Sequence, residues 1–366
     1  MDKIKSLTGM LDLYDDGDNS LLPAKLFYLE EKIKHIFKSY KLNEIRTPVL
    51  EDANLFIRSV GGASDIVNKE IYSFNDRNDK GIALRPEGTA SVIRSIVEKK
   101  LDQSNHKLWY LGPMWRYERP QKGRYRQFNQ AGVEILGIPE GMPEFEMISI
   151  VCSIITEFNL ENCTIKINHL GNQKSKESFC NALIDFLEPH KKLLDEKDNQ
   201  RLEKNPLRVL DTKNTNTQEI LKNAPSIKEF LDSSSVNLLN SIKNEFSDIC
   251  DIEIDYTLVR GLDYYSGFVF EAVSSNLGAQ DSFLGGGRYD QLCAKLGGKN
   301  LPSIGMAIGL ERFAELIEVN NLPEKVVSFI VVTGNLEPKA YKIAHQLRSL
   351  NKDIVLDIHL SEGSLK

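Results

Sequence analysis

The sequence predicts an α+β fold that is interrupted by a helical insertion and followed by a small α/β unit. Two β-rich runs, "LWYLGPMWRYE" and "RQFNQAGVEILG", flank a polar, positively charged segment and predict a long hairpin. Residues 170–251 are instead rich in lysine and aspartate, short of glycine and helical in period. After Pro323, the runs "VVSFIVVTG", "PKAYKIAHQLRSL" and "DIVLDIHL" form a β-α-β pattern.

The segments before the hairpin predict a helix, a short strand and a strand-to-helix unit. "LPAKLFYLEEKIKHIFKSYK" has apolar residues at helical spacing, and Pro23 suits a first turn. "EIRTPVLED" predicts a strand broken by Pro48, which suits a sheet edge or an interface. "GIALRPEGTASVIRSIVEKK" predicts a strand that passes through a Pro-Glu-Gly turn into a helix.

After the insertion the β pattern resumes. "IDYTLV" and "YYSGFVFEAVS" predict two strands, and "LGGGRYD" predicts a glycine-rich turn. "IGMAIGLERFAELIE" predicts a strand that enters a helix.

Composition narrows the class of protein. A chain of 366 residues allows about two or three domains. With a net charge of −6, nucleic-acid contact depends on local basic patches. The five cysteines are widely spaced without a C-x-x-C pair, so neither a disulfide framework nor a metal site is expected. The N-terminus is too polar for a signal peptide, and no apolar run of about 18 residues follows, which predicts a cytoplasmic protein without a membrane span.

The stretch "RYERPQKGRYRQFNQ" is the strongest basic patch, with four arginines and one lysine between Arg116 and Arg126. Arginine presents a planar fork of donors that matches phosphate oxygens, whereas lysine offers a point charge. The patch therefore suits a polyphosphate or one end of an RNA. A solvated basic loop is the alternative.

Two further segments carry candidate polar groups. In "LRPEGT", Glu87 lies beside Thr89, where a carboxylate receives an ammonium group or caps the following helix. In "LVRGLDYYSGFVFE", Arg260 precedes two adjacent tyrosines, Tyr264 and Tyr265. In a regular strand these tyrosines point to opposite faces, so at most one lines a pocket. For these tyrosines, packing in the core with the hydroxyl hydrogen-bonded is the alternative.

The last candidate is the glycine run of "LGGGRYDQL" with the segment "GMAIGLERF". The glycines allow backbone to approach a ligand or form only a tight turn. They match neither G-x-G-x-x-G nor a P-loop, which removes support for those nucleotide-binding folds. Arg312 opens a helix after a glycine-containing strand, where an anion is favoured.

Taken in order, these segments resemble class II aminoacyl-tRNA synthetases. "TPVLED", "WRYERPQKGRYRQFNQAGVEILG" and "GMAIGLERF" resemble the three signature motifs of the class. "LVRGLDYYSGFVFE" and "GGGRYDQL" resemble the segments that distinguish histidyl-tRNA synthetases, and "LRPEGT" and "LTGMLDL" also fit that family. The resemblance extends over about residues 7–325.

The resemblance implies a six-stranded antiparallel sheet flanked by helices, in a homodimer whose interface includes the first motif. It implies that residues 1–169 and 252–324 form a catalytic domain and 170–251 a helical insertion. Residues 325–366 would supply only part of an anticodon-binding domain, which we expect to be marginally ordered in isolation or to lean on the catalytic domain or on the dimer partner. The implied substrates are L-histidine, ATP with Mg²⁺ and tRNA(His), without a tightly bound cofactor.

The family motifs also imply roles for individual residues. Arg116 and Arg260 match arginines at the α-phosphate, and Arg124 and Arg312 match contacts to the outer phosphates. Glu118 and Phe128 match the adenine contacts, and Arg119 and Gln121 lie where the loop would meet the tRNA acceptor end. Gln130 matches a position beside the ammonium-binding turn of Glu87 and Thr89, and it is counted with Arg116 and Arg260 among the catalytic residues. Glu134 would accept a hydrogen bond from the imidazole. The implied histidine site consists of Glu87, Gly88, Thr89, Gln130, Glu134, Tyr264, Tyr265 and Tyr289.

Two other functions remain open at this point. The first is a regulatory paralogue that assists an ATP phosphoribosyltransferase in histidine biosynthesis. Such chains lack the anticodon domain and tend to lose the catalytic arginines, which Arg116, Arg124, Arg260 and Arg312 here retain. The second is an inactive synthetase that acts only as a histidine-binding dimer.

Overall fold

The structure is a computed structural model that describes residues 3–14, 21–60, 69–278, 281–318, 327–330 and 336–358. The chain divides into two compact units, Met1–Glu318 and Val319–Lys366. Each unit has its own buried apolar core.

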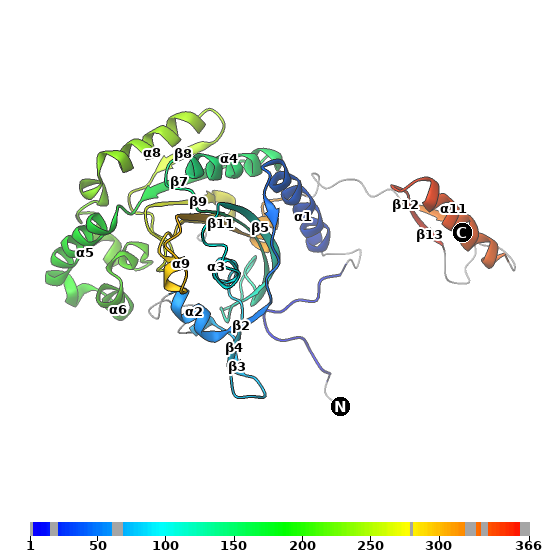
Figure 1. The fold of residues 1–366 in the computed structure, drawn as a ribbon, viewed down its shortest axis with the longest axis horizontal. Coiled ribbons are helices and arrows are strands. Elements are labelled where there is room, and N and C mark those ends of the chain that lie inside the picture. Colours follow the sequence, from blue (N-terminus) through cyan, green and yellow to red (C-terminus); the bar gives the residue numbers. More distant parts are fainter. Residues whose placement is uncertain are drawn as a thin grey trace. The chain divides into compact units, whose positions relative to one another are not determined.

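The centre of the first unit is a sheet with eight strands in its described residues (Figure 1). In spatial order these are β1 (Asn43–Glu44), β5 (His106–Trp115), β6 (Gln127–Leu136), β11 (Ser303–Gly309), β10 (Ser282–Arg288), β9 (Phe268–Ser274), β7 (Cys163–His169) and β8 (Asp251–Ile254). The six strands from β5 to β7 are antiparallel, which confirms the expected sheet. The short strands β1 and β8 pair parallel to its two edges.

A smaller antiparallel sheet has the order β2-β4-β3, with β2 at Leu50–Asp52, β4 at Gly81–Leu84 and β3 at Ser73–Asn75. The prediction of one strand over "EIRTPVLED" was therefore wrong. The chain forms β1, leaves it after Glu44, and begins β2 only after Pro48. Proline has no N–H for a ladder bond, which accounts for the interruption.

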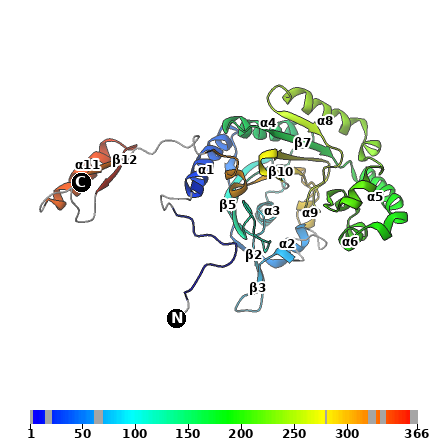
Figure 2. The same ribbon diagram turned by 180° about the vertical axis from the view of Figure 1, so that it is seen from behind.

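Helices surround the main sheet in two groups. The first contains α1 (Leu21–Ser39), α4 (Met142–Glu157), α8 (Ser233–Phe246) and α10 (Leu310–Ala314), and α1 packs on α4 and α10. The second contains α2 (Ala53–Val60), α3 (Thr89–Glu98) and α9 (Leu292–Lys295), which pack on one another. The view from behind shows α1 beside β5 at one end of the sheet and α5 and α6 beyond the other end (Figure 2).

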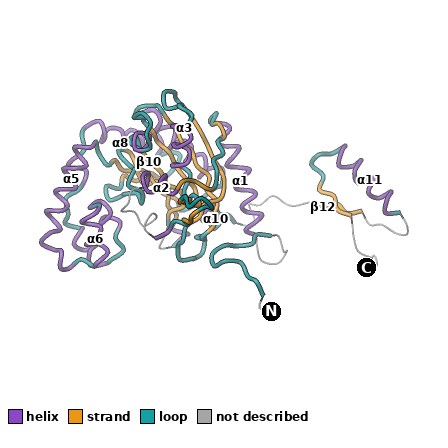
Figure 3. The backbone as a smooth tube through the Cα atoms, turned by 60° about the horizontal axis from the view of Figure 1, so that its bottom comes forward, coloured by secondary structure: helices purple, strands orange, loops and turns teal. Residues whose placement is uncertain are grey.

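The segment between β7 and β8 is helical, as its period predicts (Figure 3). It contains α5 (Gln173–Leu187), α6 (Glu196–Lys204), α7 (Thr215–Leu221) and α8, with 3₁₀ turns at Glu188–Leu193, Pro206–Asp211 and Ile227–Phe230. These α-helices begin after Asn172, Asp195, Asn214 and Asp232, whose side chains each accept a backbone N–H of the first turn. Phe179, Leu183 and Leu187 lie at helical spacing on α5 and are buried in the core of this segment.

The prediction of a glycine-rich turn over "LGGGRYD" was also wrong. Gly285, Gly286 and Gly287 lie inside β10 and are buried. A Cβ on Gly286 would lie 2.2 Å from the carbonyl oxygen of Gly305 on β11. Glycine is therefore required there by close packing rather than by a turn.

The second unit contains β12 (Val327–Ile330), α11 (Glu337–Leu350) and β13 (Val355–Ile358). The two strands pair in parallel, and Ala344 on α11 is buried in the same small core as Leu356 on β13. The expected β-α-β pattern is confirmed. The first residue of "VVSFIVVTG", its last four residues and the chain after Ile358 lie outside the described residues.

Candidate functional site

An open pocket lies on the main sheet beside the β5–β6 hairpin. Its walls come from that hairpin, from the loop before β9, from β10 and from the β11–α10 junction. All of the residues expected to contact ATP line it, namely Arg116, Glu118, Arg124, Phe128 and Arg312, and so do Gln130 and Arg260. Segments as distant in sequence as residues 116 and 312 thus meet at one place.

Arg116 is fixed at the hairpin end of the pocket. Its Nε donates to the carbonyl oxygen of Pro86 at 2.9 Å, and its guanidinium lies 5.2 Å from the centre of the Phe128 ring. The carboxylate of Glu118 is 3.7 Å from its Nη1. Arg116 therefore lies between the ring of Phe128 and the carboxylate of Glu118. The aromatic ring suits stacking with an adenine base, and the carboxylate suits a hydrogen bond from it.

The arginine-rich loop has a defined conformation. The backbone groups of Gln121 and Arg124 bond to each other across a tight turn. At its base, Arg126 lies 3.7 Å from the centre of the Tyr117 ring. Arg119 and Gln121 are exposed on this loop.

Arg312 lies at the far side of the pocket, within the short helix α10, which starts two residues earlier at Leu310 rather than at the arginine. Its Nη1 and Nη2 donate to the carbonyl oxygens of Lys122 and Leu277 at 3.2 and 3.1 Å. Burial, together with the charge of Arg124, lowers the pKa of Arg312. An anionic partner in the pocket would stabilise the charged form of this guanidinium.

Three buried polar atoms that line the pocket have no hydrogen-bond partner among the described residues. They are Gln130 Oε1, Arg260 Nε and Arg312 Nε. Because an unsatisfied buried donor or acceptor costs about 1–3 kcal/mol, such atoms in one pocket indicate a polar ligand.

A second polar cluster lies next to this pocket, around Glu134 on β6. Thr89 donates its hydroxyl to Glu134 Oε1 at 2.7 Å, and the Tyr289 hydroxyl donates to Oε2. Glu134 is fully buried, which raises its pKa to about 8. The expected histidine residues Thr89, Glu134 and Tyr289 are thus brought into contact.

Glu87 lies at the start of α3, where its carboxylate accepts the backbone N–H groups of Thr89 and Ala90 at 2.7 and 2.8 Å. The capping alternative therefore holds for this residue. Burial raises the pKa of Glu87, while the N–H groups act in the opposite direction. The buried carboxylate is also suited to an ammonium group.

The prediction that Tyr264 and Tyr265 point to opposite faces of a regular strand was wrong. The strand expected over "IDYTLV" ends at Ile254, and β9 starts only at Phe268, so both tyrosines lie in an irregular loop. Their rings are 4.7 Å apart, and the Tyr264 ring is 5.6 Å from that of Tyr289. Both tyrosines therefore lie in the aromatic wall near Glu134.

Sequence reasoning missed three residues of the site. Tyr110 on β5 lies over Gly88 and Gly132, where a Cβ would come within 2.3 and 2.2 Å of its ring. Glu311 accepts both the backbone N–H and the side-chain amide of Asn129, which ties α10 to β6. Glu271 pairs with Arg260. Only the strand alternation at Tyr110 offered a local signal.

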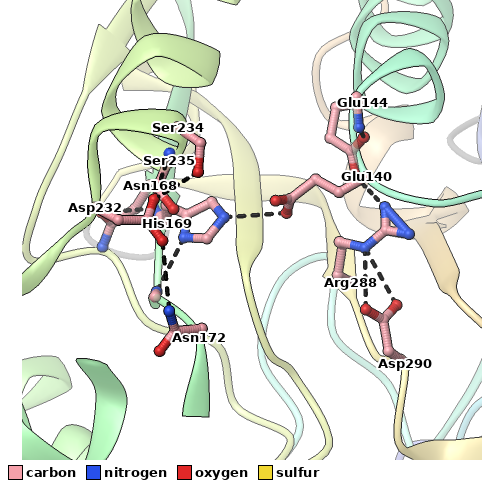
Figure 4. A network of polar contacts seen from close by, with 12 residues as sticks. Glu140, Glu144, Asn168, His169, Asn172, Asp232, Ser234, Ser235, Arg288 and Asp290 are labelled. Carbon is pink, nitrogen blue, oxygen red and sulfur yellow. Dashed lines mark hydrogen bonds and ion pairs between the residues drawn. The ribbon is translucent and has the colours of Figure 1, made fainter. Parts of the chain in front are cut away.

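A network of polar contacts around Arg288 fixes the backbone of Tyr289. Figure 4 shows the contacts of Arg288 with Glu144 and Asp290. Arg288 pairs with Glu144 at 2.5 Å and with Asp290 at 3.1 Å. Asp290 also accepts the N–H of Ser303, whose carbonyl oxygen accepts the N–H of Tyr289. Figure 4 also shows that Glu140 connects this region to His169, with 3.0 Å between Oε1 and Nε2.

Other kinds of site were searched among the described residues. No group of three or more His, Cys, Asp or Glu side chains there could hold a metal ion, and all five cysteines are free thiols. In the same part of the chain, no helix is long and apolar enough to cross a membrane.

An antiparallel sheet of this topology, with motif arginines lining one pocket on its face, defines a class II aminoacyl-tRNA synthetase. The family profile described as histidyl-tRNA synthetase matches residues 22–313, and the chain belongs to this family. It is 42% identical over 361 residues to a histidine–tRNA ligase of Francisella philomiragia, covering 96% of this chain and 85% of the relative. It is 44% identical over 351 residues to a histidine–tRNA ligase of Microcystis aeruginosa, covering 93% and 82%.

Solved structures agree with the sequence relatives. The apo histidyl-tRNA synthetase of S. aureus superposes with a TM-score of 0.77 at 30% identity, over 99% of this chain and 87% of that one. A Bacillus halodurans protein described as an ATP phosphoribosyltransferase regulatory subunit/histidyl-tRNA synthetase has a TM-score of 0.69 at 20% identity, over 99% of this chain and 94% of that one. The latter likeness concerns the fold alone.

Proposed function

We propose that this chain is a histidine–tRNA ligase that activates L-histidine with ATP and transfers it to the 3′ end of tRNA(His). The three unpartnered polar atoms that line the arginine pocket are the observation that carries the proposal. The adjoining Glu134 cluster supplies a separate place for an amino-acid side chain.

In the first step, a carboxylate oxygen of histidine attacks the α-phosphorus of ATP, and pyrophosphate leaves with the bonding electrons. Such an in-line displacement needs positioning and charge neutralisation more than covalent catalysis. Arg116 and Arg260 hold the α-phosphate, while Arg124 and Arg312 hold the outer phosphates of ATP bound with Mg²⁺. Gln130 lines the arginine pocket on the same strand as Glu134, and it orients the histidine carboxylate.

The adenine base stacks on Phe128, and Glu118 accepts a hydrogen bond from it. This assignment is supported by the position of Phe128 directly beside Arg116 in the pocket wall. In the second step, a hydroxyl of the terminal tRNA ribose attacks the histidyl carbonyl and AMP leaves. Arg119 and Gln121, exposed on the hairpin loop, contact the acceptor end.

Histidine is selected by Glu134, which accepts the imidazole N–H in a buried site. Tyr264, Tyr265 and Tyr289 form the aromatic wall around it. The ammonium group lies at the start of α3, next to Glu87, Gly88 and Thr89. A site built from placed polar partners strongly rejects amino acids that lack the matching group.

A homodimer belongs to the same proposal. Val49, Leu50, Ile57 and Phe74 are 39–49% exposed on and beside the small sheet that carries the first motif. Large exposed apolar residues on neighbouring elements, here α2 and the strands that it contacts, favour an interface. Light scattering of the purified chain tests this arrangement. We place the enzyme in the cytoplasm, with its substrates ATP and tRNA.

The direct test is histidine-dependent ATP–pyrophosphate exchange, followed by aminoacylation of tRNA(His). Arg260→Ala should keep histidine affinity within a few-fold and slow exchange by about 10²-fold, as for loss of a preorganised charge. The ligase relatives of 40–44% identity favour this function over the regulatory paralogue. Histidine binding without any exchange would instead support the regulatory alternative.

A further inference from the structure

Arg260 depends on residues outside its own loop for its position. It comes from the irregular segment before β9, yet its guanidinium lies against strands β9 and β10. Nη1 is 3.0 Å from the carboxylate of Glu271 on β9. Its Nε is buried and has no hydrogen-bond partner within the described part of the chain. One edge of the fork is therefore held, and the other remains available to the pocket.

Gly285 on β10 provides the room for this arrangement. A Cβ at Gly285 would lie 2.1–2.5 Å from the three terminal atoms of the Arg260 guanidinium, which is closer than any real contact. Any other residue would displace the arginine. The backbone of Gly285 is not in the left-handed region, so turn geometry does not require glycine there.

The strand register places these two requirements side by side. Glu271 and Gly285 are direct partners in the β9–β10 ladder, so they share a face of the sheet. Ala307 on β11 is the next partner in the same row, and it also lines the pocket. The row thus presents a carboxylate followed by a floor without bulky side chains, on which a flat guanidinium rests.

The charge of Glu271 complements this shape. Burial lowers the pKa of Arg260, but Glu271, together with Tyr265 and Tyr264, more than offsets that effect and keeps the pKa above its ordinary value. A cation held in place before substrate arrives needs no reorganisation during the reaction, which is the basis of electrostatic preorganisation.

We propose that Glu271 and Gly285 are positioning residues for Arg260, Glu271 by pairing with one edge of its fork and Gly285 by leaving space for the guanidinium. The inference rests on the proposed role of Arg260 at the α-phosphate. Neither residue needs to touch substrate, so both act through the arginine alone.

The experiment is a double-mutant cycle measured by ATP–pyrophosphate exchange. Gly285→Ala and Glu271→Gln are made in the natural chain and in Arg260→Ala, and kcat and the KM values for histidine and ATP are determined. In the natural chain each should lower kcat by about tenfold or more with the histidine KM within a few-fold. In the Arg260→Ala background each should change kcat by less than about twofold, because the residue on which it acts is absent.

Gly81→Ala is the matched control, since a Cβ on this strand glycine lies 3.8 Å from its nearest neighbour and needs no rearrangement. Glu271→Gln keeps the side-chain volume, so it tests the proposal even where Gly285→Ala does not fold. Equal losses in both backgrounds would assign the residues to strand packing and overturn the inference. Unchanged exchange in Arg260→Ala itself would instead reject the role of the arginine, a failure of the proposed function that is seen before any cycle is completed.

Discussion

Replacing Glu134 with glutamine tests the histidine site with almost no change in shape. The carboxylate is fully buried, and its two oxygens accept from the hydroxyls of Thr89 and Tyr289. A Cβ on the neighbouring Gly305 would lie 1.8 Å from Oε2, so the carboxylate fills the space that a side chain at Gly305 would need. The substitution exchanges one acceptor oxygen for an NH₂ donor.

The magnitude follows from this geometry. One hydroxyl must rotate away from the new donor, and a bound imidazole N–H loses its carboxyl acceptor. A buried hydrogen-bonding group left without its partner costs about 1–3 kcal/mol. Histidine binding should therefore weaken by about 5–150-fold, since about 1.4 kcal/mol corresponds to a tenfold change. ATP affinity measured without histidine should hardly change.

Calorimetry with histidine and with ATP measures the two affinities separately, and thermal unfolding reports on the fold. Glu51→Gln is a matched control, because Glu51 is a second buried carboxylate but pairs with Arg94 away from the pocket. An equal loss of affinity for both ligands in Glu134→Gln would show that Glu134 supports the fold rather than reading the imidazole.

Three further predictions concern pH, the N-terminal segment and the phosphate contacts. Burial raises the pKa of Glu134 to about 8, so the stability that its protonated form contributes is full below pH ~4.5 and is lost toward pH ~8. Over that window, the unfolding free energy of the natural chain relative to that of Glu134→Gln should fall by about 1.4 kcal/mol per pH unit. Denaturant titrations at several pH values measure this difference. A difference independent of pH would contradict the assigned pKa. Gly9 has φ +78°, and its carbonyl oxygen accepts the N–H of Arg126 at the base of the hairpin. A Cβ at Gly9 would lie 2.9 Å from side-chain atoms of Arg126 and Pro120. Gly9→Ala should therefore destabilise the hairpin base by about 1–2 kcal/mol and raise the KM for ATP several-fold. An unchanged KM would separate this segment from the site. Arg312→Lys keeps the positive charge but loses the planar guanidinium, so the KM for ATP should rise about tenfold in exchange assays. A KM equal to that of the natural chain would mean that the charge alone is sufficient.

Local patterns predicted the elements whose cause is local. The β5–β6 hairpin, the strand-to-helix unit around Glu87 and the capped helices between β7 and β8 all follow from periodicity and from side chains near each helix start. The edge strands β1 and β8 could not be predicted in this way. They have two and four residues, and their pairing with β5 and β7 comes from tertiary packing rather than from an alternating pattern.

The glycines of β10 show why the site was only partly predictable. Glycine usually marks a turn, because it adopts conformations closed to other residues, and the sequence pattern gave no reason to prefer another explanation. The structure requires glycine at Gly285 for a different reason, the approach of Arg260, and at Gly286 because β11 passes too close for a side chain. Both contacts join residues that are 25 and 19 positions apart in sequence and depend on the final register. The family motifs predicted residues that the structure brings together, but only the register of β9, β10 and β11 explains why Glu271 is an acid and why its neighbour must have no side chain.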